Sequence, residues 1–452
     1  SSIDSLSMLP KQEEELILGR SITPAGLSFN PGAVDLGNEA PINVRFESVV
    51  ATDPDAVALV HNEKIWRYGD LNSYSNQIAH SLLSLHLSAS SIVGVYMDRS
   101  VEFVGCLLGI FKSGHVYTPL DTNNPPSRIG SMLSANPFSV LITTSSLLSE
   151  LGELKDILVL VIDKLPVRLS SDNPVKDVVV YDSDMIAGKP TDNPANMNLM
   201  DSWAYILYTS GSTGNPKGAI TRHDGAMNHI LAEYAVMDLP DGFRFLQSAG
   251  IGSDISVWQI LGPLLKGGVS VIVDKYELLE YGKLLDTLIL RRVTLIEFVP
   301  TYMWGLLSYI KEQDEAVVLE DLSSVMLVGE SIPVAMVNDL KRLYPEVRLW
   351  NAYGPCEASD DVIQYEINDF LEETQVRVPI GRVIPNMNTV ILDKSGGLCP
   401  IGVIGEIGVS GVGVGAGYLG LPDRTSESFI ENPFDDLLGD VLYKTGDLGR
   451  WL

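Results

Sequence analysis

The chain has 452 residues, which is too long for a single hydrophobic core, so we expect two or three packed subdomains. Charged residues make up 20% of it and hydrophobic residues 45%, an ordinary balance for a globular protein. The formal net charge of −27 argues against a surface for nucleic acid or anionic membranes, and no apolar run reaches the roughly 18 residues that span a bilayer. We therefore expect neither a nucleic acid nor a membrane as a partner.

Residues 1–40 are mixed in pattern, and we interpret them as a leader or part of an upstream linker. Ser1–Pro10 lacks the basic start and apolar centre of a signal peptide. Three cysteines cannot form a disulfide framework and predict a reducing compartment, so we expect the protein in the cytosol. The six histidines show no metal-ligand spacing, and we interpret His223 and His229 as surface or locally hydrogen-bonded residues.

Strand-like and helical runs alternate from residue 41 to 200 and again from 201 to 365. In the first stretch, Ile92–Tyr96 is a strand candidate, and Ser100 can cap a helix with one apolar face. In the second, Leu295–Val299 and Val325–Val328 are candidates for buried strands. Alternating βα units predict an α/β fold with two sheets, each covered by helices.

Residues 366–452 change to short strands and glycine-rich turns, and here Thr389–Leu392 and Gly405–Ser410 predict a small distorted antiparallel β-barrel. The stretch Gly411–Ala416 also matches the loose dinucleotide fingerprint G-x-G-x-x-A. The glycines and Pro422 that follow it cannot open a helix, so a pyrophosphate would find no helix N-terminus. We therefore interpret this stretch as a turn of the small barrel.

The most informative segment is Tyr208–Gly218, with the sequence YTSGSTGNPKG. Its glycines let the backbone approach an anion closely, and its successive N–H groups can form a nest for phosphate oxygens. It is not a Walker A loop, in which Ser or Thr follows the lysine at the start of a helix, because Gly218 follows Lys217. The alternative, a flexible surface loop, is disfavoured by the Pro-Lys-Gly end lying directly against a strand-like run.

This segment resembles the phosphate-binding signature of the acyl-adenylate-forming enzymes, and closely that of nonribosomal peptide synthetase adenylation domains. Further motifs of that family follow in its order, at Gly252–Gln259, Asn351–Glu357 and Tyr443–Asp447. The resemblance implies the large subdomain of such a domain, with two layered sheets and a small barrel. The family's small C-terminal subdomain carries a further lysine, and we expect it to lie outside the chain, which ends at Leu452. Without that lysine we expect slow adenylation.

The resemblance assigns ATP and Mg²⁺ to the chain, because adenylation joins a carboxylate to the α-phosphate of ATP and releases pyrophosphate. The implied phosphate-binding residues are Thr209, Ser210, Gly211, Ser212, Thr213, Gly214 and Lys217. Glu357 would hold Mg²⁺, a hard cation that prefers carboxylate oxygen. Thr209, Lys217 and Glu357 are the predicted catalytic residues. A thiol, Cys356, stands where the family usually has threonine, and a thiol is the weaker donor.

The adenosine site follows from the same resemblance. The Tyr353 ring would pack on adenine, Asn351 would read the adenine edge, and Ala352 and Gly354 would lie beside them. Asp447 would accept both ribose hydroxyls. Taken singly, such acids are ordinary solvated surface residues, and their assignment rests on the ordered set of motifs.

Substrate choice depends on a third group, aligned by motif to Asp254, Ile255, Trp258, Glu297, Met326, Val328, Ala352, Asp360 and Asp361. Asp254 would pair with the α-ammonium of an amino acid, and Ser253 stands where most relatives carry Phe. A buried carboxylate without a partner is costly, so Glu297 and any other inward acid should meet a cation or several donors. For Asp360 and Asp361, a solvated loop pair remains the open alternative.

These acids predict a polar, donor-rich substrate such as ornithine, an ornithine derivative, lysine or arginine. The sequences of Gly19–Thr23 and Ser253–Ile260 also resemble those of fungal siderophore synthetases, whose adenylation domains take Nδ-acyl-Nδ-hydroxyornithine. The implied partners are a carrier protein with phosphopantetheine and neighbouring synthetase domains. One rival is an acyl- or aryl-CoA ligase of the same fold, against which Asp254 argues. The other is a degenerate scaffolding module, against which the intact phosphate loop argues.

Overall fold

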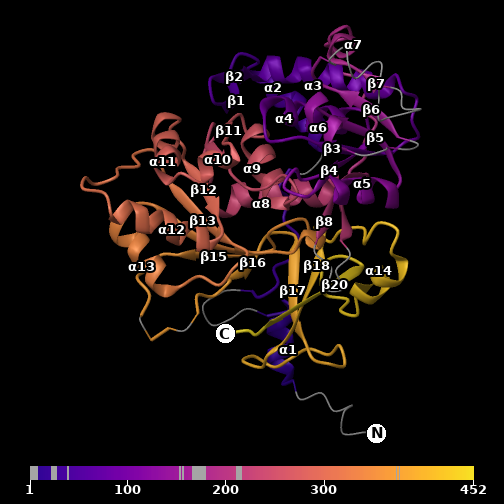
Figure 1. The fold of residues 1–452 in the computed structure, drawn as a ribbon. Helices are drawn as coiled ribbons and strands as arrows, with labels where there is room; N and C mark the ends of the chain where they lie inside the picture. Colours follow the sequence, from indigo (N-terminus) through magenta and orange to yellow (C-terminus); the bar gives the residue numbers. More distant parts are fainter. Residues whose placement is uncertain are drawn as a thin grey trace.

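The computed structural model describes residues 9–21, 28–37, 40–151, 154, 157–164, 180–209, 216–372, 374–375 and 377–452. Their strands form three sheets, and helices cover the two larger ones (Figure 1). The predicted α/β class is therefore confirmed. The helices are α1 (Lys11–Ile17), α2 (Ile42–Thr52), α3 (Tyr68–Leu83), α4 (Val101–Lys112), α5 (Pro126–Ala135), α6 (Ser145–Glu150), α7 (Ser183–Ala187), α8 (His223–Val236), α9 (Asp254–Leu264), α10 (Lys275–Leu278), α11 (Tyr281–Leu290), α12 (Pro300–Lys311), α13 (Val334–Leu343), the 3₁₀ turn η3 (Cys356–Ala358) and α14 (Pro422–Ser428).

The largest sheet in the described chain has nine strands in the order β16-β15-β14-β13-β12-β10-β11-β1-β2. They are β1 (Val57–His61), β2 (Lys64–Arg67), β10 (Arg244–Gln247), β11 (Val269–Ile272), β12 (Leu295–Phe298), β13 (Ser324–Val328), β14 (Arg348–Tyr353), β15 (Ile363–Ile367) and β16 (Arg382–Val383). The six neighbouring strands β14, β13, β12, β10, β11 and β1 pair in parallel. Strand β2 pairs antiparallel at one edge of the sheet, and β15 and β16 do so at the other. The two buried-strand candidates of this region are thus β12 and β13.

A second sheet has seven described strands in the order β7-β6-β5-β3-β4-β8-β9. They are β3 (Ile92–Tyr96), β4 (Val116–Pro119), β5 (Phe138–Thr143), β6 (Leu158–Val161), β7 (Val180–Tyr181), β8 (Trp203–Thr209) and β9 (Lys217–Arg222). The predicted strand at 92–96 is β3, and Ser100 caps α4 by accepting a hydrogen bond from the Phe103 backbone N–H (3.1 Å). Strands β8 and β9 form an antiparallel pair whose register joins Thr209 to Lys217.

The two sheets enclose one large hydrophobic core that also contains α3, α4, α8 and α9. On its far side the nine-stranded sheet packs against α11, α12 and α13, and the seven-stranded sheet packs against α5 and α6. The result is a layered αβαβα arrangement with α8 and α9 at its centre (Figure 1). Helix α8 is consequently buried along almost its whole length, and polar side chains on it must find partners inside the protein.

The third sheet is antiparallel, with the described order β17-β18-β20-β19. Its strands are β17 (Met387–Leu392), β18 (Gly405–Gly411), β19 (Phe429–Glu431) and β20 (Val441–Gly449). Part of residues 1–40, interpreted above as a leader or linker, packs against this sheet. Ile17 of α1 packs with Val390 and Leu442 beneath this sheet (Figure 1), and Asn30 bonds to the Thr389 backbone through both its amide groups.

The sheets do not follow the expected boundary near residue 200. Strands β1 and β2 precede that boundary but belong to the nine-stranded sheet, in which β1 pairs with β11. Strands β8 and β9 follow it but extend the seven-stranded sheet beside β4. Local hydrophobic patterns indicate that a strand exists, whereas these pairings join segments distant in the chain, and nothing in a local pattern specifies the partner.

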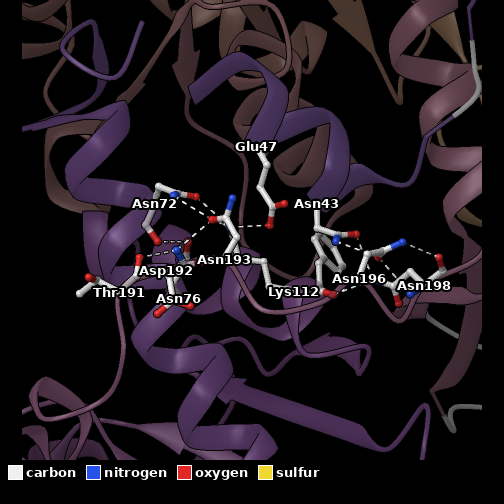
Figure 2. A network of polar contacts seen from close by, with 12 residues as sticks. Asn43, Glu47, Asn72, Asn76, Lys112, Thr191, Asp192, Asn193, Asn196 and Asn198 are labelled. Carbon is white, nitrogen blue, oxygen red and sulfur yellow. Dashed lines mark hydrogen bonds and ion pairs between the residues drawn. The ribbon is translucent and has the colours of Figure 1, made fainter. Parts of the chain in front are cut away.

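A buried polar network fastens the segment that leads into β8 (Figure 2). Lys112 at the end of α4 is fully buried and donates to Glu47 (2.8 Å), Asn72 (2.8 Å) and Asn193 (3.2 Å). Asn198 donates to the Phe111 backbone carbonyl (2.6 Å) in the same network. Asn193 and Asn198 precede β8 by only a few residues, so the network helps to fix the position of β8, whose last residue is Thr209.

Within the described part of the chain, no helix combines the length and apolarity needed to cross a membrane. Cys106, Cys356 and Cys399 are all free, in agreement with the prediction that they form no disulfide framework.

Candidate functional site

The predicted nucleotide residues that the structure describes lie at the ends of β8 and β14, at the start of β9 and near the end of β20. Glu357, in η3 directly after β14, is buried and accepts a hydrogen bond from the Tyr418 hydroxyl (2.9 Å) and a longer one from Thr209 (3.5 Å). The ammonium of Lys217 lies 4.9 Å from the centre of the Tyr418 ring. Three segments far apart in the sequence therefore bring a carboxylate, two hydroxyls and one cation together.

The glycine-rich stretch that resembles a dinucleotide fingerprint has a structural role in this arrangement. The Gly415 backbone N–H donates to the Glu357 carbonyl (2.9 Å), and Ala416 and Gly417 exchange hydrogen bonds with Ile220 of β9. A Cβ on Gly415 would lie 2.5 Å from the Ile220 carbonyl oxygen, so only glycine fits. The stretch thus holds Tyr418 against Glu357, and its interpretation as a turn is consistent with these contacts.

The predicted ribose and adenine residues are in direct contact. The Tyr353 hydroxyl donates to the exposed Asp447 carboxylate (2.7 Å), which joins the end of β14 to β20. Burial raises the pKa of Tyr353, so the phenol remains a donor at neutral pH. Asn351 is buried, and one of its amide N–H groups is held by the Pro379 carbonyl (2.7 Å), leaving fewer groups free to read an adenine edge.

Alternation along β14 separates two sets of predicted residues. Side chains of successive strand residues point to opposite faces, so Asn351 and Tyr353 share one face and Ala352 takes the other. Ala352 faces the large core together with Met326 and Val328 of the neighbouring strand. Glu297 of β12 is paired in register with Met326 and lies on that same face. One strand thus carries the candidate nucleotide residues on one side and the candidate substrate residues on the other.

The remaining substrate residues come from α9 and from the turn after η3. Asp254 is the first residue of α9, and its buried carboxylate accepts bonds from the Ser253 hydroxyl (3.1 Å) and the Ile255 backbone N–H (3.1 Å). Ser253, which departs from the family pattern, thus orients this carboxylate. Trp258 lies one turn further along the helix and is buried in the core.

A tight turn directs the last two acids inward. Ser359 and Asp360 both have positive φ (65° and 82°), a conformation that non-glycine residues adopt at a cost. A Cβ on Gly354 would lie 1.9 Å from the Asp360 carbonyl oxygen, so this close approach requires glycine. Asp360 and Asp361 are buried rather than solvated, which removes the alternative of a solvated loop pair.

Five buried carboxyl groups lie close enough for their charges to interact, and we call them the acidic cluster: Glu233, Asp254, Glu297, Asp360 and Asp361. Burial, reinforced by the neighbouring acids, raises the pKa of Glu297, Asp360 and Asp361 well above the usual range of a carboxyl. Both oxygens of Asp361 lack a hydrogen-bond partner in the described structure, whereas Glu297 has the Gln259 amide beside it, which counteracts part of the rise in its pKa.

His229 is the basic residue beside the acidic cluster. His223 and His229 were predicted to be surface or locally hydrogen-bonded residues, and because both are buried, the surface alternative is excluded. His229 Nε2 lies 3.4 Å from Glu233 Oε1, one turn along α8, and its Nδ1 lies 3.9 Å from Asp360 Oδ2. Burial opposes protonation, but the charges of Asp360 and Glu233 outweigh it and raise the pKa of His229. His223 is fully buried, and burial lowers its pKa to about 4.

The structure therefore unites most of the predicted residues, and it adds some that sequence reasoning missed. Tyr418, His229 and Glu233 were absent from the predicted site. Tyr418 follows the stretch Gly411–Ala416, which was interpreted only as a turn. The spacing of His229 and Glu233 by four residues on one helix was the available signal for these two. The predicted phosphate residues Ser210, Gly211, Ser212, Thr213 and Gly214 lie outside the described residues.

Comparison with known proteins identifies the family of the chain. The model of the AMP-binding enzyme family matches residues 46–419. The chain belongs to that family. This AMP-binding enzyme is 30% identical over its whole length to tyrocidine synthase 3 of Brevibacillus parabrevis, and 31% identical over 450 residues to gramicidin S synthase 2 of Brevibacillus brevis. It spans only 6% and 9% of these two relatives.

A solved structure of the nonribosomal peptide synthetase FmoA3 with AMPPNP bound shares the fold of this AMP-binding enzyme. The TM-score is 0.85 at 24% identity, over 99% of the chain and 44% of the FmoA3 chain. The layered architecture described above is therefore shared with this part of FmoA3.

Proposed function

We propose that the chain activates an amino acid, joining its carboxylate to the α-phosphate of ATP and releasing pyrophosphate. The observation that carries this proposal is the division of β14. Tyr353, which bonds to Asp447, faces the candidate nucleotide side, while Ala352 faces the buried Asp254 side. A nucleotide and an amino acid bound on either side of this strand end would bring their reacting groups together near Glu357.

The residues present fit ATP and Mg²⁺. Mg²⁺ is commonly held by one or two carboxylates together with phosphate oxygens, and Glu357 supplies one carboxylate beside the hydroxyls of Thr209 and Tyr418. When bound, the metal would neutralise phosphate charge. Lys217 would contribute the positive charge that attack by a carboxylate anion on a phosphate requires. Asp447 would orient the ribose while Tyr353 holds that carboxylate in place.

The substrate in this proposal is a polar or basic amino acid. Asp254, positioned by Ser253, would bind its α-ammonium, a feature that an acyl- or aryl-CoA ligase has no need for. The likeness to fungal siderophore synthetases makes Nδ-acyl-Nδ-hydroxyornithine one candidate, for a hydroxamate siderophore. The matched relatives are far longer than the chain, which supports a carrier protein with phosphopantetheine and neighbouring domains as partners. Three free cysteines support a reducing compartment such as the cytosol.

Binding and exchange measurements test this proposal. Calorimetry should show Mg²⁺–ATP binding, and ATP–pyrophosphate exchange over a panel of amino acids and fatty or aryl acids should depend on an amino acid. Asp254→Asn should remove the amino-acid dependence and leave Mg²⁺–ATP binding intact. Exchange supported by a fatty or aryl acid alone would favour the CoA-ligase alternative, and failure to bind Mg²⁺–ATP would refute the adenylation proposal.

A further inference from the structure

We propose that Tyr418 positions both charged groups of the candidate nucleotide site: its ring holds the ammonium of Lys217, and its hydroxyl holds the carboxylate of Glu357. This inference rests on the proposed ATP-dependent activation, in which these two groups meet the phosphates and Mg²⁺. It adds a positioning residue to them, and the two functions of that residue can be removed one at a time by different substitutions.

Backbone pairing places the Tyr418 ring beside Lys217. Residues 417–419 run antiparallel to the start of β9, and Tyr418 lies opposite Ala219. Successive side chains of a strand alternate between two faces, so Lys217 shares the face of Ala219 and is the diagonal neighbour of Tyr418. Diagonal neighbours are within reach of long and aromatic side chains. The ammonium accordingly lies 4.9 Å from the centre of the ring.

Contacts with the following segment hold this ring in place. The Tyr418 backbone N–H donates to the Thr425 hydroxyl of α14 (3.0 Å), and the Phe429 ring packs edge-on against the tyrosine ring (centres 5.4 Å apart). Gly417 has a φ of 98°, and a Cβ there would lie 2.4 Å from the Thr425 side chain, so the turn toward α14 requires glycine. Since Tyr418 is also 5% exposed, it is a fixed partner for a flexible lysine.

The ring restricts the lysine without using up its hydrogen-bond donors. The face of an aromatic ring attracts a cation that lies within about 6 Å of its centre. An ammonium has three N–H donors, so contact with the ring on one side leaves donors for phosphate oxygens. Binding restricts the rotamers of a long side chain at a cost in entropy, and a ring that has already restricted Lys217 reduces that cost. We therefore expect the ring to strengthen the binding of a triphosphate.

The hydroxyl acts on Glu357 instead. It donates to Oε1 (2.9 Å), the same oxygen that the Thr209 hydroxyl approaches at 3.5 Å. Burial and the neighbouring Glu357 raise the pKa of Tyr418 to about 12 against opposing hydrogen bonds from Tyr443 and Ser428, so the phenol keeps its proton at neutral pH. Because Glu357 is the candidate residue for Mg²⁺, loss of the hydroxyl should matter chiefly when Mg²⁺ is present.

A purely structural role for Tyr418 is the alternative. Loss of the ring would then disturb the start of β9 and weaken the binding of every nucleotide, whether or not Lys217 is present. AMP has no β- or γ-phosphate for the lysine to contact. Comparison of ATP with AMP therefore separates a positioned lysine from a damaged strand.

Calorimetry with ATP and AMP, each with Mg²⁺ and with EDTA, can test the two functions in the parent, Tyr418→Phe and Tyr418→Leu. Without Mg²⁺, Tyr418→Phe keeps the ring and should bind ATP within about twofold of the parent. Tyr418→Leu should bind it roughly three- to tenfold more weakly, which corresponds to one cation–ring contact. With Mg²⁺, Tyr418→Phe should lose about tenfold, and Tyr418→Leu should lose the factor of the ring in addition. AMP without Mg²⁺ should bind all three proteins alike.

Two controls accompany these variants. In a Lys217→Met background the difference between Tyr418→Phe and Tyr418→Leu should disappear, because the ring has no cation to hold. Tyr276→Leu is the matched control: Lys275 lies 5.4 Å from the centre of the exposed Tyr276 ring, so this change removes a lysine–tyrosine contact outside the site and should leave nucleotide binding unchanged. Thermal denaturation checks that each variant is folded, and Tyr418→Met replaces Tyr418→Leu if the latter does not fold.

The inference is overturned if Tyr418→Leu binds Mg²⁺-free ATP as tightly as Tyr418→Phe or more tightly, if their difference persists in the Lys217→Met background, or if AMP binding falls together with ATP binding. An equal loss for Tyr418→Phe with and without Mg²⁺ would overturn the function assigned to the hydroxyl. All of these results leave ATP binding by the parent, and with it the proposed function, standing. If the parent binds no ATP in either condition, the proposed function is refuted and the inference falls with it.

Discussion

Replacing Glu297 by glutamine should stabilise the protein without ligand, and the gain should grow with pH. Burial and the neighbouring acids raise the pKa of this carboxyl well above its ordinary value of 4.5. Between that ordinary value and the raised one, the folded chain holds a proton that the unfolded chain has released. The free energy of unfolding therefore falls as pH rises through this window, and the glutamine variant lacks that fall.

The size of the effect follows from linkage. Each pH unit inside the window lowers the free energy of unfolding by about 1.4 kcal/mol for one such group. From about pH 5.5 to about pH 7.5, the variant should gain up to roughly 2.7 kcal/mol over the parent, as long as the raised pKa is not passed.

Urea denaturation at several pH values measures this difference. Tryptophan fluorescence suits it, because Trp258 packs against His229 beside the cluster (ring centres 5.5 Å apart). Glu346→Gln, at an exposed position, should give a pH-independent offset near zero. A difference between Glu297→Gln and the parent that stays constant from pH 5.5 to 7.5 would refute the reasoning, because it would mean that Glu297 carries the same number of protons in the folded and the unfolded chain.

Three further substitutions test contacts outside the acidic cluster. Tyr418→Phe removes the hydroxyl that donates to Glu357 and should weaken Mg²⁺–ATP binding by roughly tenfold in calorimetry, since bonds to charged groups contribute about 1.5–3 kcal/mol; unchanged affinity would contradict this role. Asp447→Ala should weaken ATP by about tenfold but leave 2′,3′-dideoxy-ATP unaffected, and an equal loss for both would exclude ribose recognition. Lys112→Met leaves Glu47 without its buried cation and should lower the free energy of unfolding by about 3 kcal/mol in urea; a loss under 1 kcal/mol would show that the network is not needed for stability.

The candidate nucleotide residues could be chosen from the sequence because they lie in short contiguous motifs, and their binding role stays a prediction. Asn351–Glu357 supplies a strand end, a glycine that permits a close approach and a carboxylate within seven residues. In such a segment local geometry fixes which side chains face together, so sequence spacing carries the information. The strands β3, β12 and β13 were predictable for the same reason, as apolar runs bounded by polar residues.

The remainder could not be predicted because it depends on which distant segments pair. The packing of α1 under the third sheet, and the exchange of β1 and β8 between the two large sheets, are decided by contacts between segments far apart in the chain. His229 and Glu233 look like ordinary polar residues of a surface helix in the sequence. They become part of the site only because α8 lies between the sheets, where nearly every position is buried.

The acidic cluster carries a cost in stability. Carboxylates such as Asp361 destabilise the fold while they are buried without partners, and a well-packed neutral interior would avoid that cost. A variant that replaces one of these carboxyls by its amide should therefore gain stability, and the gain should be largest at a pH where the unfolded chain is fully ionised.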